Sequence, residues 1–242
     1  MTWNETLMTN THVVALGGSL LRPEEADKRR EWLGQLRQLA VHIEGNSKHL
    51  GIVVGGGLPA REGIELAKNI ISDSYKLDLI GIAATRLNAT ILQQMFVDIG
   101  CDVADSIPLN TEEAALLLKK HALVVMGGTK PGHTTDAVAI ALARDCGAKN
   151  CIIATNVDFV YDKDPRVNED AQAMYDITID ELALITGSEP LKPGQSAVVD
   201  PVAVGWAKDS SIDIAVLDGR KLSLLEDALD GNDFDGTLIR SV

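Results

Sequence analysis

The chain has 242 residues, and its 35 acidic side chains outnumber its 22 lysines and arginines, which gives a formal net charge of −13. With 45% hydrophobic and 24% charged residues, it has the composition of a globular protein large enough for a substantial core. The acidic balance argues against a general nucleic-acid binder, which needs a basic face. Most of the excess acid lies in residues 155–181 and 209–236, which we interpret as an acidic outer surface.

Apolar runs and cysteines bear on the location of the protein. No apolar run approaches the roughly 18 residues of a membrane helix, and the first residues show no secretory signal, so we expect no membrane partner. The cysteines, Cys101, Cys146 and Cys151, form no CxxC pair, which predicts reduced thiols in the cytoplasm. We expect residues 1–11 to be an N-terminal extension and residues 12–242 to form a single domain.

The first half of the chain alternates short β-branched runs with longer stretches of helical periodicity. The predicted strands are residues 13–16, 51–54 and 102–104, and the predicted helices are residues 28–43, 59–71, 75–99 and 111–119.

The second half continues the same alternation. Its predicted strands are residues 122–126, 151–154 and 212–217, and its predicted helices are residues 135–146, 179–185, 201–208 and 222–229. Strands that alternate with helices of this length form βαβ units. The pattern therefore predicts an α/β protein, a three-layer α/β/α sandwich around a mostly parallel sheet covered on both faces.

Three glycine clusters, residues 17–19, 55–57 and 127–129, each follow a predicted strand. In a parallel sheet all three lie at the carboxyl edge, where open α/β sheets bind ligands. A helix follows each cluster, and the unpaired N–H groups of its first turn favour phosphate. The alternative is that the glycines merely end their strands. Neither a Walker A loop nor a GxGxxG fingerprint is present.

Residues 127–136 form the segment richest in functional groups, with hydroxyls, a cation, an imidazole and a carboxylate just before a helix. Thr134 or Thr135 is suited to cap that helix and to donate to a phosphate or ribose, and Asp136 lies in its first turn. The alternative is a polar turn with a capping threonine. In the acidic segment 155–165, Tyr161 is suited to flank a ring and Asp164 to fix a turn.

Several motifs occur in a characteristic order: ALGGSLL, VVGGG, DLIGI with TRLNA, VMGGTKPGHTTDAVA and TNVDFVYDKDP. In this order they resemble the amino-acid kinase family, and within it the UMP kinase branch of archaeal type. The resemblance extends from about residue 13 to residue 239 and implies transfer of a phosphoryl group from ATP to UMP in pyrimidine nucleotide synthesis.

The resemblance also implies roles for residues. It places Gly18, Ser19, Gly57 and Arg61 on the ATP side, with Thr155, Asn156, Tyr161 and Asp164 at the purine and ribose. It places Gly56, Asp78, Thr129, Lys130, Pro131, Gly132, His133, Thr134 and Thr135 at UMP, and Asp136 as the carboxylate that orients the catalytic cations. It further implies an acceptor-nucleotide lobe of about residues 12–150 and an ATP lobe of about residues 151–242. It implies that Mg²⁺ is carried with ATP rather than held on a metal site of the protein. It also implies a homo-oligomer, expected to be a hexamer.

The sequence departs from the family pattern at cationic positions. Ala15 and Gly205 stand where many members have lysine, and Phe159 replaces a usual glycine. We expect another cation to take over, with Lys130 as the first choice ahead of Lys163, Lys192, Arg22 and Lys208. Two alternatives remain at this stage: a non-catalytic nucleotide-binding homologue, and a kinase of another small phosphate such as isopentenyl phosphate.

Overall fold

The computed structural model describes residues 10–21, 26–165, 167–187 and 198–241. It contains a seven-stranded sheet in the order β3-β2-β1-β4-β8-β9-β7. The strands β3, β2, β1, β4 and β8 run parallel, β9 is antiparallel to β8, and β7 is parallel to β9. Their bounds are Leu123–Met126 for β3, His49–Val54 for β2, Thr11–Leu16 for β1, Asn150–Thr155 for β4, Asp213–Asp218 for β8, Thr237–Arg240 for β9 and Asp176–Thr178 for β7.

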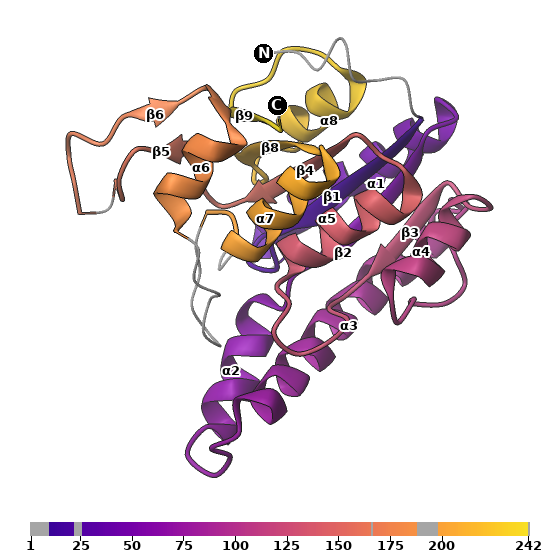
Figure 1. Ribbon diagram of the computed structural model, residues 1–242. Helices are drawn as coiled ribbons and strands as arrows, with labels where there is room; N and C mark the ends of the chain where they lie inside the picture. Colours follow the sequence, from indigo (N-terminus) through magenta and orange to yellow (C-terminus); the bar gives the residue numbers. More distant parts are fainter. Residues whose placement is uncertain (1–9, 22–25, 166, 188–197, 242) are drawn as a thin grey trace.

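Helices cover both faces of the sheet (Figure 1). One face carries α1 (Ala26–Gly45), α3 (Ser74–Asp98) and α8 (Leu222–Asp230), and the other carries α4 (Thr111–Leu118), α5 (Thr135–Cys146) and α7 (Pro201–Ser210). The helix α2 (Gly57–Ala67) packs along α3, and α2 with the first part of α3 extends away from the sheet. The helix α6 (Ile179–Thr186) packs on α7, and β5 (Val160–Tyr161) pairs with β6 (Ala173–Met174) in a small hairpin. The predicted three-layer sandwich with a mostly parallel sheet is confirmed.

The alternation of side chains along β1 separates two cores. Val14 and Leu16 point into the layer that contains Trp32 of α1 and Leu225 of α8. Val13 and Ala15 point into the layer with the α5 helix. Successive residues of a strand face opposite sides, so a strand buried on both faces must be apolar throughout. This explains why β1 and its neighbours are continuous apolar runs.

Some predicted elements differ from those observed. The predicted strand at residues 102–104 is wrong, because the structure has only an isolated bridge between Val103 and Leu123. The helix predicted over residues 59–71 covers Gly57–Ala67 instead. The short strands β5, β6, β7 and β9 were not predicted, because two to four residues carry too little periodicity.

Among the helices that the structure describes, none combines the length and hydropathy needed to cross a bilayer.

The two acidic stretches differ in exposure. Every acid of residues 155–181 is exposed, as expected for an outer surface. The stretch 209–236 is mixed, because Asp218 is buried against Arg220 and Asp230 pairs with Lys48. The interpretation as an acidic outer surface therefore holds for the first stretch and only partly for the second.

Candidate active site

Two glycine loops pack backbone against backbone at the carboxyl edge of the sheet. A Cβ atom added to Gly18 would lie 2.3 Å from the carbonyl oxygen of Gly55 and 2.4 Å from the nitrogen of Gly57. Gly57 itself has φ +59°, a left-handed conformation that favours glycine. The loops after β1 and β2 therefore form one continuous surface of main chain, on which a ligand can approach the N–H groups closely.

The helix α3 holds the second and third glycine loops in place. Asn88, which is fully buried, donates from Nδ2 to the carbonyl oxygens of Gly55 at 2.8 Å and Gly56 at 3.1 Å. Thr85 Oγ1 accepts from the N–H of Gly128 at 2.7 Å.

The loop between β3 and α5, residues 127–134, is held at a further point. Asp78, about two helical turns before Thr85 on α3, accepts from the N–H of Gly132 at 2.8 Å through Oδ2. Since Gly132 has φ +82°, a left-handed conformation that favours glycine, this contact holds the β3–α5 loop at a turn. Asp78 thus reaches the predicted UMP loop, while its contact with UMP stays a prediction.

The first turn of α5 meets the start of α7 through a group of carboxyl and hydroxyl side chains. Thr134 caps α5 and donates from Oγ1 to Oδ2 of Asp200, the N-cap of α7, at 2.5 Å. The main-chain N–H of Asp200 in turn donates to Oδ2 of Asp136 at 3.3 Å. Of the two threonines suggested as the cap, the structure selects Thr134 over Thr135.

The Asp136 carboxyl group is enclosed, although the residue keeps some accessible surface. Burial raises its pKa to about 7, and the nearby Asp200 carboxylate adds to this effect, while the Asp200 N–H opposes it. Within the part of the chain that the structure describes, no cation contributes to this shift. A positive charge beside Asp136, which the resemblance assigns to orienting the catalytic cations, would therefore stabilise its ionised carboxylate.

Of the residues predicted for the purine and ribose, Thr155 and Asn156 lie at the end of β4, whereas Tyr161 is on β5 and Asp164 follows it. Thr155 is the last residue of β4, and its carbonyl oxygen accepts from the N–H of Gly219, which follows β8. Asn156 and Asp164 are exposed, and the Tyr161 hydroxyl donates to Asp158 at 3.0 Å.

An aromatic group occupies the segment in which Phe159 replaces the usual glycine. The Phe159 ring packs edge-on against Tyr175 at 5.0 Å and Tyr161 at 6.4 Å. The larger side chain therefore shapes the β5–β6 hairpin by packing.

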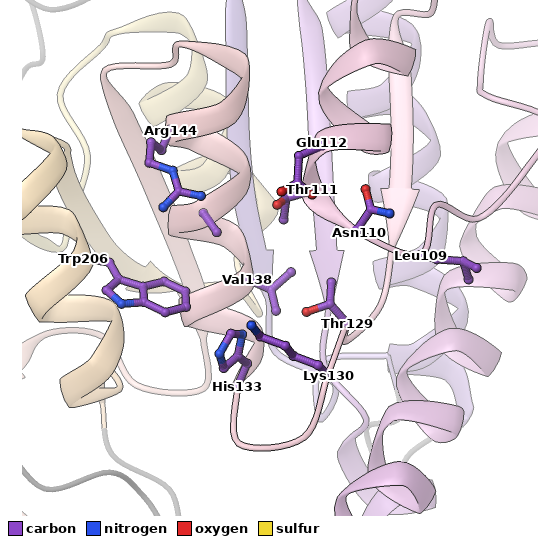
Figure 2. A pocket seen from close by; sticks show the side chains of 11 residues that line it. Leu109, Asn110, Thr111, Glu112, Thr129, Lys130, His133, Val138, Arg144 and Trp206 are labelled. Atoms are coloured by element: carbon purple, nitrogen blue, oxygen red, sulfur yellow. The ribbon is translucent and has the colours of Figure 1, made fainter.

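The candidate cations have different surroundings. Lys163 pairs with Asp170 at 2.6 Å and Lys208 with Asp180 at 2.5 Å, both at the surface. Lys130 has no ion-pair partner among the described residues, and its side chain lies over α5 beside His133 (Figure 2). Arg22 and Lys192 lie outside the described residues, and Arg61 is exposed on α2.

Three residues with clear structural roles at this edge were missed as site residues: Asn88, Asp200 and Gly219. The sequence feature that could have identified Asn88 is a polar residue on an otherwise apolar face of a helix. Gly219 adds a fourth glycine at the carboxyl edge, where a Cβ would lie 2.4 Å from Leu20 Cδ1. Asp200 before Pro201 is a recognisable helix start, but this local signal carries no information about a contact with Thr134.

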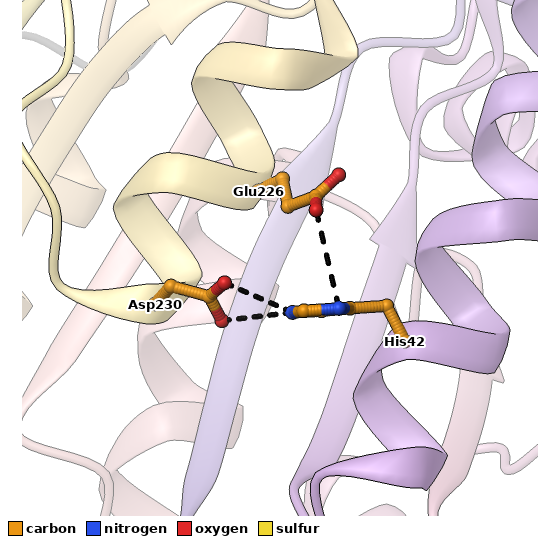
Figure 3. A group of neighbouring side chains, drawn as sticks. All are labelled: His42, Glu226 and Asp230. Atoms are coloured by element: carbon orange, nitrogen blue, oxygen red, sulfur yellow. Dashed lines mark hydrogen bonds and ion pairs between the residues drawn. The ribbon is translucent and has the colours of Figure 1, made fainter.

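One group of side chains among the described residues could hold a metal ion, and it lies elsewhere (Figure 3). His42 of α1 contacts Asp230 of α8 at 2.9 Å through Nε2, and its Nδ1 lies 3.9 Å from Glu226. Lys48, directly before β2, already contacts Asp230 at 2.5 Å. This group lies by the amino end of β2, so it joins α1 to α8 far from the glycine loops.

The fold and the site define a class: an α/β protein whose glycine loops gather at the carboxyl edge of its sheet, where such folds favour phosphate-bearing ligands. The model of the amino acid kinase family matches residues 10–218. The chain therefore belongs to the amino acid kinase family.

Curated relatives cover most of the chain. It is 37% identical over 230 residues to the uridylate kinase of Methanococcus aeolicus, covering 94% of this chain and 98% of that protein. It is 43% identical over 191 residues to the uridylate kinase of Methanococcus maripaludis, covering 79% and 83%. The crystal structure of uridylate kinase from Archaeoglobus fulgidus superposes with a TM-score of 0.79 at 37% identity, covering 94% of this chain and 99% of that one.

Proposed function

We propose that this protein is a uridylate kinase, which transfers the γ-phosphoryl group of ATP to UMP and so forms ADP and UDP. The observation that carries the proposal is the continuous main-chain surface of Gly18, Gly55 and Gly57 beside the first turn of α5. The names of relatives that align over most of the chain support UMP as the acceptor.

The chemistry asks for positioning and for charge neutralisation. A phosphate oxygen of UMP attacks the γ-phosphorus, and the bond from that phosphorus to the bridging oxygen of ADP breaks. Because the attacking phosphate is already anionic, no strong base is needed. Charge spreads over the equatorial oxygens of the transferring group, where aligned N–H groups of the glycine loops stabilise it.

Mg²⁺ carried with ATP fits the residues present. Asp136 and Asp200 are carboxylates at the junction of α5 and α7, and carboxylate oxygens are ligands that Mg²⁺ prefers. When bound, the ion neutralises phosphate charge. We propose that Asp136 orients it, and that a cation near Asp136 stabilises the ionised carboxylate.

We divide the ligands between two parts of the chain. Residues of about 12–150 hold UMP through Gly56, Asp78 and the β3–α5 loop. Residues of about 151–242 hold ATP through the ends of β4 and β8. The three free cysteines, of which Cys101 and Cys151 are buried, support the cytoplasm as the compartment.

We propose that the protein works as a homo-oligomer, with a hexamer as the expected form. Large apolar side chains are exposed where α2 and α3 extend from the sheet, with Leu66 82% and Ile70 88% accessible. A contact between copies would remove this surface from water. Light scattering after size exclusion measures the assembly, and a monomer at micromolar concentration contradicts the proposal.

A coupled ADP-release assay tests the activity with UMP, CMP, dUMP and isopentenyl phosphate as acceptors. We expect turnover with UMP and much less with isopentenyl phosphate. If the pure protein binds ATP and UMP without UMP-dependent ADP formation, it is a non-catalytic homologue. If isopentenyl phosphate is the preferred acceptor, the assignment of the pocket to UMP is wrong.

A further inference from the structure

A concave site lies on the outer side of α5, next to the β3–α5 loop. It is a cavity of about 360 Å³ on the sheet face covered by α4, α5 and α7 (Figure 2). Its floor is the outer side of α5, one wall is α7 with the β3–α5 loop, and the other is the start of α4. Its lining includes Glu112, Lys130, His133, Ala141, Arg144 and Trp206.

The cavity and the catalytic edge lie on different sides of α5. Val138, Ala141 and Arg144, which line the cavity, are spaced by three and form one stripe of the helix. Asp136 lies two residues before Val138, about 200° around the helix, and so points away from the cavity. A ligand here would not compete with a phosphate held beside Asp136. The side chains of Lys130 and His133, which the resemblance assigns to UMP, line this cavity, so the proposal leaves the contact of their loop with UMP to its main chain.

The lining provides a ring platform. The Trp206 and His133 rings meet edge-to-face with centroids 4.9 Å apart, and both side chains point into the cavity. Burial and the nearby Lys130 lower the pKa of His133, so its imidazole is neutral near pH 7. Two fixed rings above an aliphatic floor favour a flat apolar or aromatic group.

The charges limit the ligand to one anionic group. Lys130 has no ion-pair partner in the described part of the chain, and its side chain lies beside the ring pair. Arg144 at the far end is already matched by Asp145 at 2.9 Å, and Glu112 adds a negative charge at the rim. One unpaired positive charge remains, and a polyphosphate would meet the Glu112 carboxylate.

We propose that this cavity is a binding site for a small flat ring that carries one anionic group, a carboxylate or a monophosphate. The ring lies against Trp206 and His133, and the anionic group pairs with Lys130. The volume is within the range of small-molecule sites. Since Lys130 and His133 belong to the β3–α5 loop, the ligand holds this loop from the side opposite to Asp78.

Calorimetric titration with benzoate, phenyl phosphate and benzamide tests the proposal, first without UMP and again with UMP in excess. Loss of anion binding when UMP is present would show that the cavity belongs to the acceptor site, and it overturns the proposal. We expect benzoate or phenyl phosphate to bind once per chain, and benzamide, which has the shape of benzoate without the charge, to bind about tenfold more weakly. The better of the two anions identifies the class of ligand. Equal affinity for benzoate and benzamide, or no saturable binding of either anion, overturns the proposal.

Two variants locate the binding. Trp206→Leu removes the ring platform, and Ala141→Leu fills the floor with aliphatic volume. Each is expected to raise the Kd of the better anion by about tenfold while the KM values of the proposed kinase reaction stay unchanged. Leu116→Ala, an exposed position on α4 outside the cavity, is the matched control. Binding that survives both cavity variants lies elsewhere and overturns the proposal. If Ala141→Leu fails to fold, the result with Trp206→Leu decides.

Discussion

The Asp78 carboxylate on α3 accepts a hydrogen bond at 2.8 Å from the N–H of Gly132, 54 positions further along the chain. This contact links the helix beside the second glycine loop to the turn of the β3–α5 loop. The other carboxylate oxygen of Asp78, Oδ1, takes no part in this contact. The same residue can therefore position the loop and accept a hydroxyl group of the acceptor nucleotide.

Asp78→Ala is expected to raise the KM for UMP by about tenfold or more, with a smaller effect on kcat, because the loop and the nucleotide both lose an acceptor. Steady-state kinetics at saturating ATP measure both constants. Asp78 is only half-buried, so the melting temperature should change little. A lower melting temperature with an unchanged KM would show that Asp78 is purely structural.

Asn88→Ala is expected to lower the free energy of unfolding by about 1–3 kcal/mol, because it leaves the buried carbonyl oxygen of Gly55 and the partly buried one of Gly56 without this donor. Urea denaturation followed by circular dichroism measures the loss. Gln94→Ala is the matched control, since Gln94 lies exposed on the same helix. Equal effects of the two substitutions would contradict the role assigned to Asn88.

Gly18→Ala is expected to abolish activity, because the added methyl group would lie 2.3 to 2.5 Å from main-chain atoms of Gly55 and Gly57 and must separate the two loops. Gly34→Ala, in an open position of α1, should instead stabilise the protein by about 0.5–1 kcal/mol. Kinetics and thermal denaturation of both variants provide the comparison. An active Gly18→Ala protein would show that close packing of the loops is not required.

Asp136→Asn is expected to abolish activity and yet to raise stability at alkaline pH. The pKa of Asp136 is raised to about 7 by burial, so the folded protein keeps this proton while the unfolded chain releases it near its ordinary pKa. The contribution of Asp136 to stability is therefore present at acid pH, falls as pH rises toward about 7, and stays low above that value. Urea denaturation at about pH 5 and about pH 8 should show Asp136→Asn gaining more relative to the wild type at the higher pH, since the loss in the wild type begins near the unfolded pKa and is complete only above about 7. The same difference at both values would contradict a raised pKa.

Lys130→Ala is expected to lower kcat by about tenfold or more if Lys130 supplies the cation that the family has elsewhere. In this structure the Lys130 side chain lies over α5, so such a role requires it to turn toward the transferring phosphate. Gly205→Lys places a lysine at the family position, where the exposed glycine has open space, and should reduce the loss. An unchanged kcat in Lys130→Ala removes Lys130 from the mechanism.

The large elements and the edge that carries the glycine loops were predictable from local pattern. A helix from Thr135 to Cys146 was predicted with the bounds observed, because its threonine cap and the glycine at position 147 are local signals. β9 was not predictable, because its four residues owe their conformation to pairing with β7 and β8. The direction of the Lys130 side chain likewise depends on the space between α5 and α7.

The sequence by itself determined the α/β class, the family and the three glycine clusters, because these follow from periodicity and from residue types at fixed spacing. Only the tertiary structure decided what those clusters touch. The contacts of Asn88 with Gly55, of Asp78 with Gly132 and of Thr134 with Asp200 join residues 33, 54 and 66 positions apart. Such contacts depend on how α3 and α7 pack against the sheet, and the raised pKa of Asp136 arises from the enclosure that this packing creates.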